Sequence, residues 1–161
     1  MSTLAERRAA NDKRVADDIR EYGCHVISVF DPEEKQPAFS YSVGIQEMTG
    51  APEAIVIGVQ PSLGHFMVNE YNRQVRAGTK FERGVLYSGF LAGFSIYIEP
   101  VKPSRLHDYA LGCDRYYKGK PFSTVQLIYP TTTGVWPWQA GASQWFKSNQ
   151  VMLGRQRPNR P

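Results

Sequence analysis

The chain has very little cysteine, which limits the kinds of site it can build. Its 161 residues include only Cys24 and Cys113, with no Cys-X-X-Cys spacing and no Cys/His cluster. Disulfide frameworks and structural zinc sites need more such residues at closer spacing. The sequence therefore indicates neither, and the burial preference of cysteine predicts two reduced, buried thiols.

Long hydrophobic runs are also missing. No window approaches the roughly 18 apolar residues of a membrane span. The first 23 residues carry basic side chains but lack the continuous apolar segment of a secretory signal. These absences predict a cytoplasmic protein that does not cross a membrane.

Catalytic and metal-binding motifs are absent as well. His25, His65 and His107 lie far apart without the spacing of metal ligands. Cys24 and His25 are neighbours, but consecutive residues of a strand point to opposite faces and cannot form a nucleophile–base pair. The turn at residues 57–66 lacks a glycine-rich phosphate motif, although an anion is physically allowed where it opens a helix. The sequence thus indicates no metal site and leaves open whether the protein is an enzyme.

Positive charge is in excess only near the C-terminus. The formal net charge is +4, from 19 Lys and Arg against 15 Asp and Glu. Four of the 19 lie from Lys147 onward, where there is no acid, so residues 1–146 are neutral with 15 of each sign. A nucleic-acid-binding domain usually carries a basic stripe on a folded face. We therefore disfavour nucleic acid as a partner and interpret residues 151–161 as a solvated, basic, Pro-rich tail.

The hydrophobic periodicity predicts one α+β domain over residues 1–150, with a largely antiparallel sheet of about six strands and two or three helices packed on it. A mostly solvated helix over residues 4–21 comes first. Strands at 24–30 and 39–45 form a hairpin, and the continuously apolar run 53–59 is a central strand. The remaining expected elements are a helix at 61–77, strands at 84–87 and 94–99, a helix at 104–116 capped by Ser104, and a strand at 122–129.

The chain contains three distinctive stretches in this order: YGCHVISVFDPEEKQPAFSYSVGI, APEAIVIGV and VQLIYPTTTGVWPW. Together they resemble the bacterial domain of unknown function 4262 family, and the resemblance runs from about Tyr22 to Trp138. The family usually has an acid directly after the proline of the third stretch, where this chain has Thr131. The resemblance implies a small soluble bacterial or phage protein and carries no activity, cofactor or catalytic residue.

Aromatic residues supply the candidate site. Trp136 and Trp138 lie in the loop GVWPWQ, and Tyr41 lies on a predicted strand. Tryptophan and tyrosine combine a large apolar area with one polar group, which suits a core and a binding groove equally. Polar residues that could converge with them are Glu53, Asn69 and Gln126. If the strands pair suitably, Ser40, Ser42 and Gln126 would line a common floor.

The leading hypothesis is a protein that binds a small molecule or a protein partner in a groove framed by Tyr41, Gln126, Trp136 and Trp138. A second hypothesis is a small enzyme whose chemistry comes from a bound cofactor such as a flavin. A third is an immunity or inhibitor protein that uses exposed aromatic residues as interface anchors. The ligand, the cofactor and the oligomeric state are left open.

Overall fold

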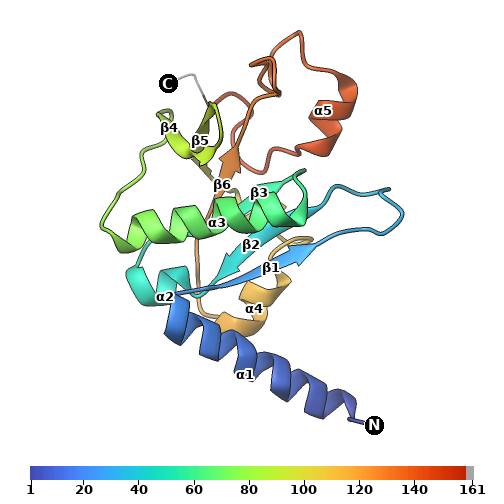
Figure 1. Ribbon diagram of the computed structural model, residues 1–161, viewed down its shortest axis with the longest axis vertical. Coiled ribbons are helices and arrows are strands. Elements are labelled where there is room, and N and C mark those ends of the chain that lie inside the picture. The colour runs from blue at the N-terminus through green and yellow to red at the C-terminus, as the bar shows by residue number, and fades with distance from the viewer. Residues whose placement is uncertain (159–161) are drawn as a thin grey trace.

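A single six-stranded sheet organises the protein. The computed structural model describes residues 1–158 and places the strands in the order β1-β2-β3-β6-β5-β4 (Figure 1). The β3–β6 pair is parallel and the other pairs are antiparallel. The strands are β1 (His25–Val29), β2 (Phe39–Val43), β3 (Glu53–Ile57), β4 (Leu86–Leu91), β5 (Phe94–Pro100) and β6 (Thr124–Ile128).

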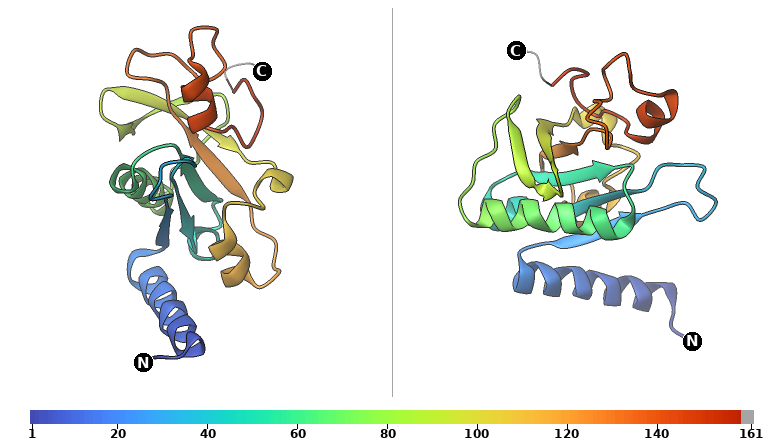
Figure 2. Two further views of the ribbon diagram at one scale, coloured as in Figure 1. Left: turned by 90° about the vertical axis from the view of Figure 1, so that its right-hand side faces the viewer. Right: turned by 45° about the horizontal axis from the view of Figure 1, so that its top comes forward.

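Helices cover both faces of the sheet. Within the described residues they are α1 (Leu4–Tyr22), α2 (Ile45–Thr49), α3 (Pro61–Arg76), α4 (Leu111–Tyr117) and α5 (Gln144–Asn149), with a short 3-10 turn η1 (Pro103–Arg105). Figure 2 shows α3 and α4 on opposite sides of the sheet. The α+β prediction is confirmed, with more helices than the two or three expected, because α2 and α5 are too short to show a clear helical period.

Each face has its own apolar core. On the side that we call the α3 face, Ala54, Val56 and Leu127 pack against Met67 and Tyr71 of α3. On the opposite side, the α4 face, strand residues including Tyr41, Val43 and Ile55 pack against Cys113 and against Val15 of α1. Alternate residues of β3 thus enter different cores, which explains why its sequence is apolar throughout.

Helix α1 begins and ends where the sequence predicts, but few of its residues are buried against the rest of the protein. The Thr3 hydroxyl accepts a hydrogen bond from Glu6 N, and the Glu6 carboxylate accepts one from Thr3 N, so a capping box starts the helix. Gly23 ends it in a left-handed conformation. Only Val15 and Ile19 of its 19 residues are buried, in agreement with the predicted solvated helix.

The prediction of a helix over residues 104–116 is wrong for the first half of that range. Residues 103–105 form the 3-10 turn, and α4 begins only at Leu111. The chain bends between these elements and brings Gly112 against the sheet, where a Cβ atom would lie 2.5 Å from Ile27 Cδ1 and 2.7 Å from the Tyr41 hydroxyl. A continuous helix capped by Ser104 would not provide this close approach.

The expected solvated tail is also wrong over part of its length. Met152, Leu153, Gly154 and Pro158 are buried against the body of the protein. A Cβ atom on Gly154 would lie only 2.3 Å from the Pro100 carbonyl oxygen. Arg160, which contributes to the predicted basic tail, lies outside the described residues.

Within residues 1–158, no helix combines the length and apolar character needed to cross a membrane.

Both cysteines should be unreactive in the folded protein. Burial raises the pKa of Cys24 to about 12 and raises that of Cys113 as well. At pH 8 a pKa of about 12 leaves roughly 1000-fold less thiolate than the ordinary value of 9.0. We expect a colorimetric thiol reagent to label two cysteines promptly in denaturant and neither at a comparable rate in native buffer. Prompt native labelling would contradict the buried positions.

Candidate functional site

One row of residues crosses four strands on the α4 face. Tyr41 pairs with Ile55, Ile55 with Gln126, and Gln126 with Glu99. Paired residues of adjacent strands point to the same face. The pairing therefore brings Tyr41 and Gln126 to one face, as the predicted groove requires, and adds a buried acid, Glu99, that sequence reasoning did not select.

Tyr41 is part of the packed interior. Its side chain is buried, and its hydroxyl accepts a hydrogen bond from Gly112 N at 2.9 Å. Burial raises its pKa to about 12. Tyr41 therefore joins α4 to β2 and does not border an open groove.

Gln126 binds the C-terminal segment through both atoms of its amide. Its Nε2 donates to the Val151 carbonyl at 2.7 Å, and its Oε1 accepts from Leu153 N at 2.8 Å. Gln150 makes the equivalent pair with the main chain of Tyr129, at 2.8 and 3.0 Å. These two side-chain amides thus make the hydrogen bonds that the main chain of an additional strand would otherwise make. They satisfy main-chain groups that are buried.

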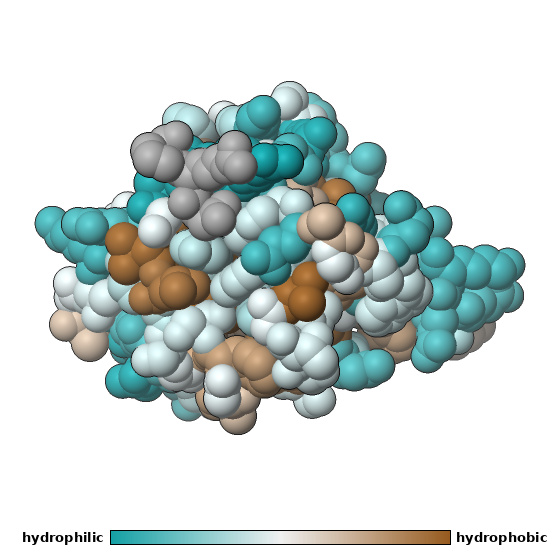
Figure 3. All heavy atoms as spheres, turned by 90° about the horizontal axis from the view of Figure 1, so that it is seen from above, coloured by the Kyte–Doolittle hydropathy of each residue, from teal (hydrophilic) through white to brown (hydrophobic). Residues whose placement is uncertain are grey.

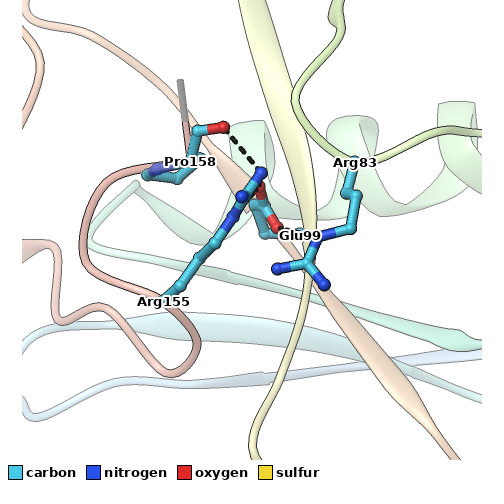
Figure 4. Close-up of polar contacts among 4 residues, drawn as sticks. All are labelled: Arg83, Glu99, Arg155 and Pro158. Atoms are coloured by element: carbon cyan, nitrogen blue, oxygen red, sulfur yellow. Dashed lines mark hydrogen bonds and ion pairs between the residues drawn. The ribbon is translucent and has the colours of Figure 1, made fainter. Parts of the chain in front are cut away.

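Glu99 extends this attachment. The carboxylate is fully buried, and its Oε1 accepts from Arg155 Nε at 2.9 Å and from Arg155 Nη2 at 2.6 Å. Arg83 Nε lies 3.7 Å from its Oε2. Figure 4 shows the two guanidinium groups approaching Glu99 from different segments, with Arg155 also bonded to the Pro158 carbonyl. This paired buried charge anchors residues 155–158.

Glu53 is a structural centre on β3 with 1% of its surface exposed. One carboxylate oxygen accepts from Ser42 Oγ at 2.7 Å and Ile45 N at 3.0 Å, and the other accepts from the Tyr117 hydroxyl. That second oxygen also accepts from the main-chain N–H groups of residues 44 and 46, each at 3.1 Å. Burial raises the pKa of Glu53, while these donors oppose the effect. The carboxylate caps the start of α2.

Asn69 and the two serines do not join Gln126. Asn69 is half-buried on α3, which covers the opposite face of the sheet. Ser40 pairs with Val56 and points away from the row that contains Gln126. The expected floor of Ser40, Ser42 and Gln126 is therefore wrong.

Trp136 and Trp138 form an aromatic stack above the sheet. Their ring centroids are 5.3 Å apart with an interplanar angle of 13°, and both rings contact Tyr97. This cluster also packs on Ile128 and Met152. The Trp138 Nε1 atom is buried and has no hydrogen-bond acceptor in the part of the chain that is described. An unpaired buried donor is uncommon and costs free energy.

Trp138 borders a groove of about 470 Å³, which we call the Trp138 groove. Its apolar wall includes Pro137, Trp138, Val151 and Met152. Three cations, Arg105, Lys147 and Arg157, lie around it, and none of its described lining residues is acidic. Of the predicted site residues, only Trp138 lines this groove, and Tyr41 and Gln126 are buried.

A second hollow, the Phe30–Trp145 cleft, lies where β3 ends and α3 begins. Its volume is about 700 Å³, and Gly58 and Pro61 form part of its lining. Phe30 is 60% exposed and Trp145 is 71% exposed. The face of the molecule shown in Figure 3 is mostly hydrophilic or intermediate in hydropathy, with separate small hydrophobic patches.

Sequence reasoning missed the cations of the groove for an identifiable reason. The charge excess from Lys147 onward was visible, but it was assigned to a solvated tail. Arg105 had no distinguishing signal, because its position beside the C-terminal segment depends on long-range packing. No group of three or more His, Cys, Asp or Glu that could hold a metal occurs among residues 1–158.

The fold and these hollows define an α+β protein with one six-stranded sheet, whose C-terminal segment builds a groove on the α4 face. The chain matches the family model described as Domain of unknown function (DUF4262) over residues 18–143 and belongs to that family. The resemblance seen in the sequence is thereby confirmed. No curated protein and no solved structure matches the chain.

Replacing Glu53 by glutamine should destabilise the protein despite equal size. Either orientation of the new amide turns its NH₂ toward at least one main-chain N–H, of Gly44, Ile45 or Gln46. We expect a loss of about 2–4 kcal/mol in the free energy of unfolding, measured by urea denaturation. The matched control Glu82→Gln changes an exposed acid and should stay within about 0.5 kcal/mol. Equal stability of the two variants would contradict the structural role.

Proposed function

We propose that this protein binds a small molecule in the Trp138 groove. The observation that carries the proposal is a groove that has the Trp138 ring in its wall and three cations around it. The Trp138 indole N–H is buried and has no acceptor among the described residues; a ligand supplies that acceptor when the ring turns its N–H toward the groove. A groove of about 470 Å³ falls within the range of roughly 300–1,000 Å³ that is typical of small-molecule sites.

The groove also combines an apolar surface with polar groups, and small-molecule sites need both. Pro137, Trp138 and Met152 provide an apolar wall, and the surrounding cations provide polar groups. Gln126 and Gln150 fix the main chain of residues 150–153 on which part of this wall depends. Buried hydrogen bonds therefore hold the Met152 side of the wall, which favours binding because little order is lost there.

Removing the indole N–H should weaken ligand binding while leaving the wall in place. We expect Trp138→Phe to reduce affinity by roughly 2- to 10-fold, as for the loss of one hydrogen bond. The measurement is mass spectrometry of small molecules released on denaturation, followed by titration of any released species. Trp145→Phe, which alters an exposed tryptophan outside the groove, is the matched control. A released ligand that binds both variants as tightly as the wild type would contradict this site.

A second candidate function is recognition of a protein partner at the Phe30–Trp145 cleft. The observation that favours it is the exposure of two large aromatic side chains, 60% and 71%, beside one hollow. Exposed aromatic residues are typical interface anchors, because their burial on binding removes a large apolar area from water.

Truncation of these aromatics should remove partner binding without unfolding the protein. Phe30→Ala and Trp145→Ala are each expected to weaken a purified partner complex by at least about 30-fold, as for interface hot spots. Thermal denaturation should change little, because both side chains are already largely in solvent. Phe66→Ala, at another exposed aromatic, is the control. Capture from the host that is equal for all three variants would contradict this candidate.

A further inference from the structure

The polar groups of the Trp138 groove have an unusual balance of donors and acceptors. Arg105, Lys147 and Arg157 come from η1, α5 and the C-terminal segment, so separate parts of the chain place three positive charges around one volume of about 470 Å³. No carboxylate among the described lining residues offsets them. Like charges this close repel one another, and a bound anion would remove that repulsion.

Three acceptors beside this groove are already engaged, which leaves the Gln156 side-chain oxygen as an open one among the described lining residues. The Val151 carbonyl accepts from Gln126, and the Met152 carbonyl accepts from Arg105 Nη1 at 2.6 Å. Both amide atoms of Gln150 are used by the main chain of Tyr129. A ligand rich in hydrogen-bond donors would therefore find few partners, whereas a ligand rich in acceptors would find many.

The donors, in contrast, are available and one of them is oriented. The bond from Arg105 to the Met152 carbonyl fixes the guanidinium while using one of its five N–H groups. Lys147 is exposed and adds an ammonium with three donors. The indole N–H of Trp138 is buried without an acceptor among the described residues and becomes a further, neutral donor if the ring turns toward the groove.

We propose that the Trp138 groove selects a small polyanion, a molecule with at least two linked phosphate or carboxylate groups. This inference rests on the proposed small-molecule function and names its ligand class. Three cations from separate elements can contact separate anionic groups at once, which a monoanion cannot exploit. The apolar wall of Pro137, Trp138 and Met152 accommodates the organic part of such a ligand.

Calorimetric titration with inorganic phosphate, pyrophosphate and tripolyphosphate, at constant ionic strength, tests the proposal. We expect affinity to rise by roughly 5-fold or more with each added phosphate, because each brings a further charge-assisted contact. Citrate is titrated in parallel to distinguish a carboxylate ligand from a phosphate ligand. Tight binding of citrate with weak binding of tripolyphosphate would assign the carboxylate class and support the polyanion proposal.

Charge variants test the location. Lys147→Gln and Arg157→Gln should each weaken the preferred polyanion by roughly 5-fold. Lys80→Gln changes the net charge equally at an exposed position outside the groove and should have little effect. An equal loss in all three variants would show non-specific attraction and overturn the proposal.

The remaining outcomes separate this inference from the proposed function. Equal affinity for phosphate and tripolyphosphate without tighter binding of citrate, or no binding of any anion probe, overturns the polyanion class. If a neutral released molecule still depends on Trp138, small-molecule binding in the groove stands without that class. If the preferred polyanion binds a Trp138→Phe variant and the wild type equally but is lost in Lys147→Gln, anion binding stands and the role given to the indole fails.

Discussion

Two buried glutamine amides hold the architecture of the C-terminal half together. Gln126 and Gln150 each donate to and accept from main-chain groups, so they join the C-terminal segment to β6 without forming a regular strand. A main-chain group buried without such a partner would cost about 1–3 kcal/mol. The wall of the Trp138 groove, including Met152, depends on these two residues.

Glu53 plays a comparable part at the start of the central strand, β3. A carboxylate that accepts from the main chain at the start of α2 fixes the connection between β2 and β3. The Tyr117 hydroxyl reaches the same carboxylate and thereby ties α4 to the sheet. The buried polar residues of this protein therefore join segments that are distant in sequence, while the apolar residues supply the bulk of its two cores.

The sequence carried enough information to predict the class of fold, the hairpin of β1 and β2, the central position of β3 and the long helices. Periodicity over many residues is a strong signal, whereas α2 and α5 span only five and six residues. The strand register could not be predicted, because it depends on long-range pairing. For that reason the common floor of Ser40, Ser42 and Gln126 was only a conjecture, and it is Tyr41 that shares a row with Gln126.

The site was harder to predict than the fold. Trp138 was selected as a groove residue, and the residues that line a groove with it come from η1, α5 and the C-terminal segment. Gln126 was singled out because its apolar neighbours Val125 and Leu127 leave the amide on the other face of the strand, and the structure gives it a structural role. The same signal, a polar residue among apolar neighbours, thus cannot distinguish a ligand contact from a hydrogen bond within the fold.

The attachment of the C-terminal segment has a consequence for folding during synthesis. The side chain of Gln126 finds its partners in residues 151–153, and Glu99 accepts its hydrogen bonds from Arg155. While those residues are still inside the ribosome, β5 and β6 can pair, but the α4 face of the sheet has an uncovered amide and a carboxylate that only Arg83 approaches. The nascent chain therefore completes this half of its interior only after residue 155 has emerged.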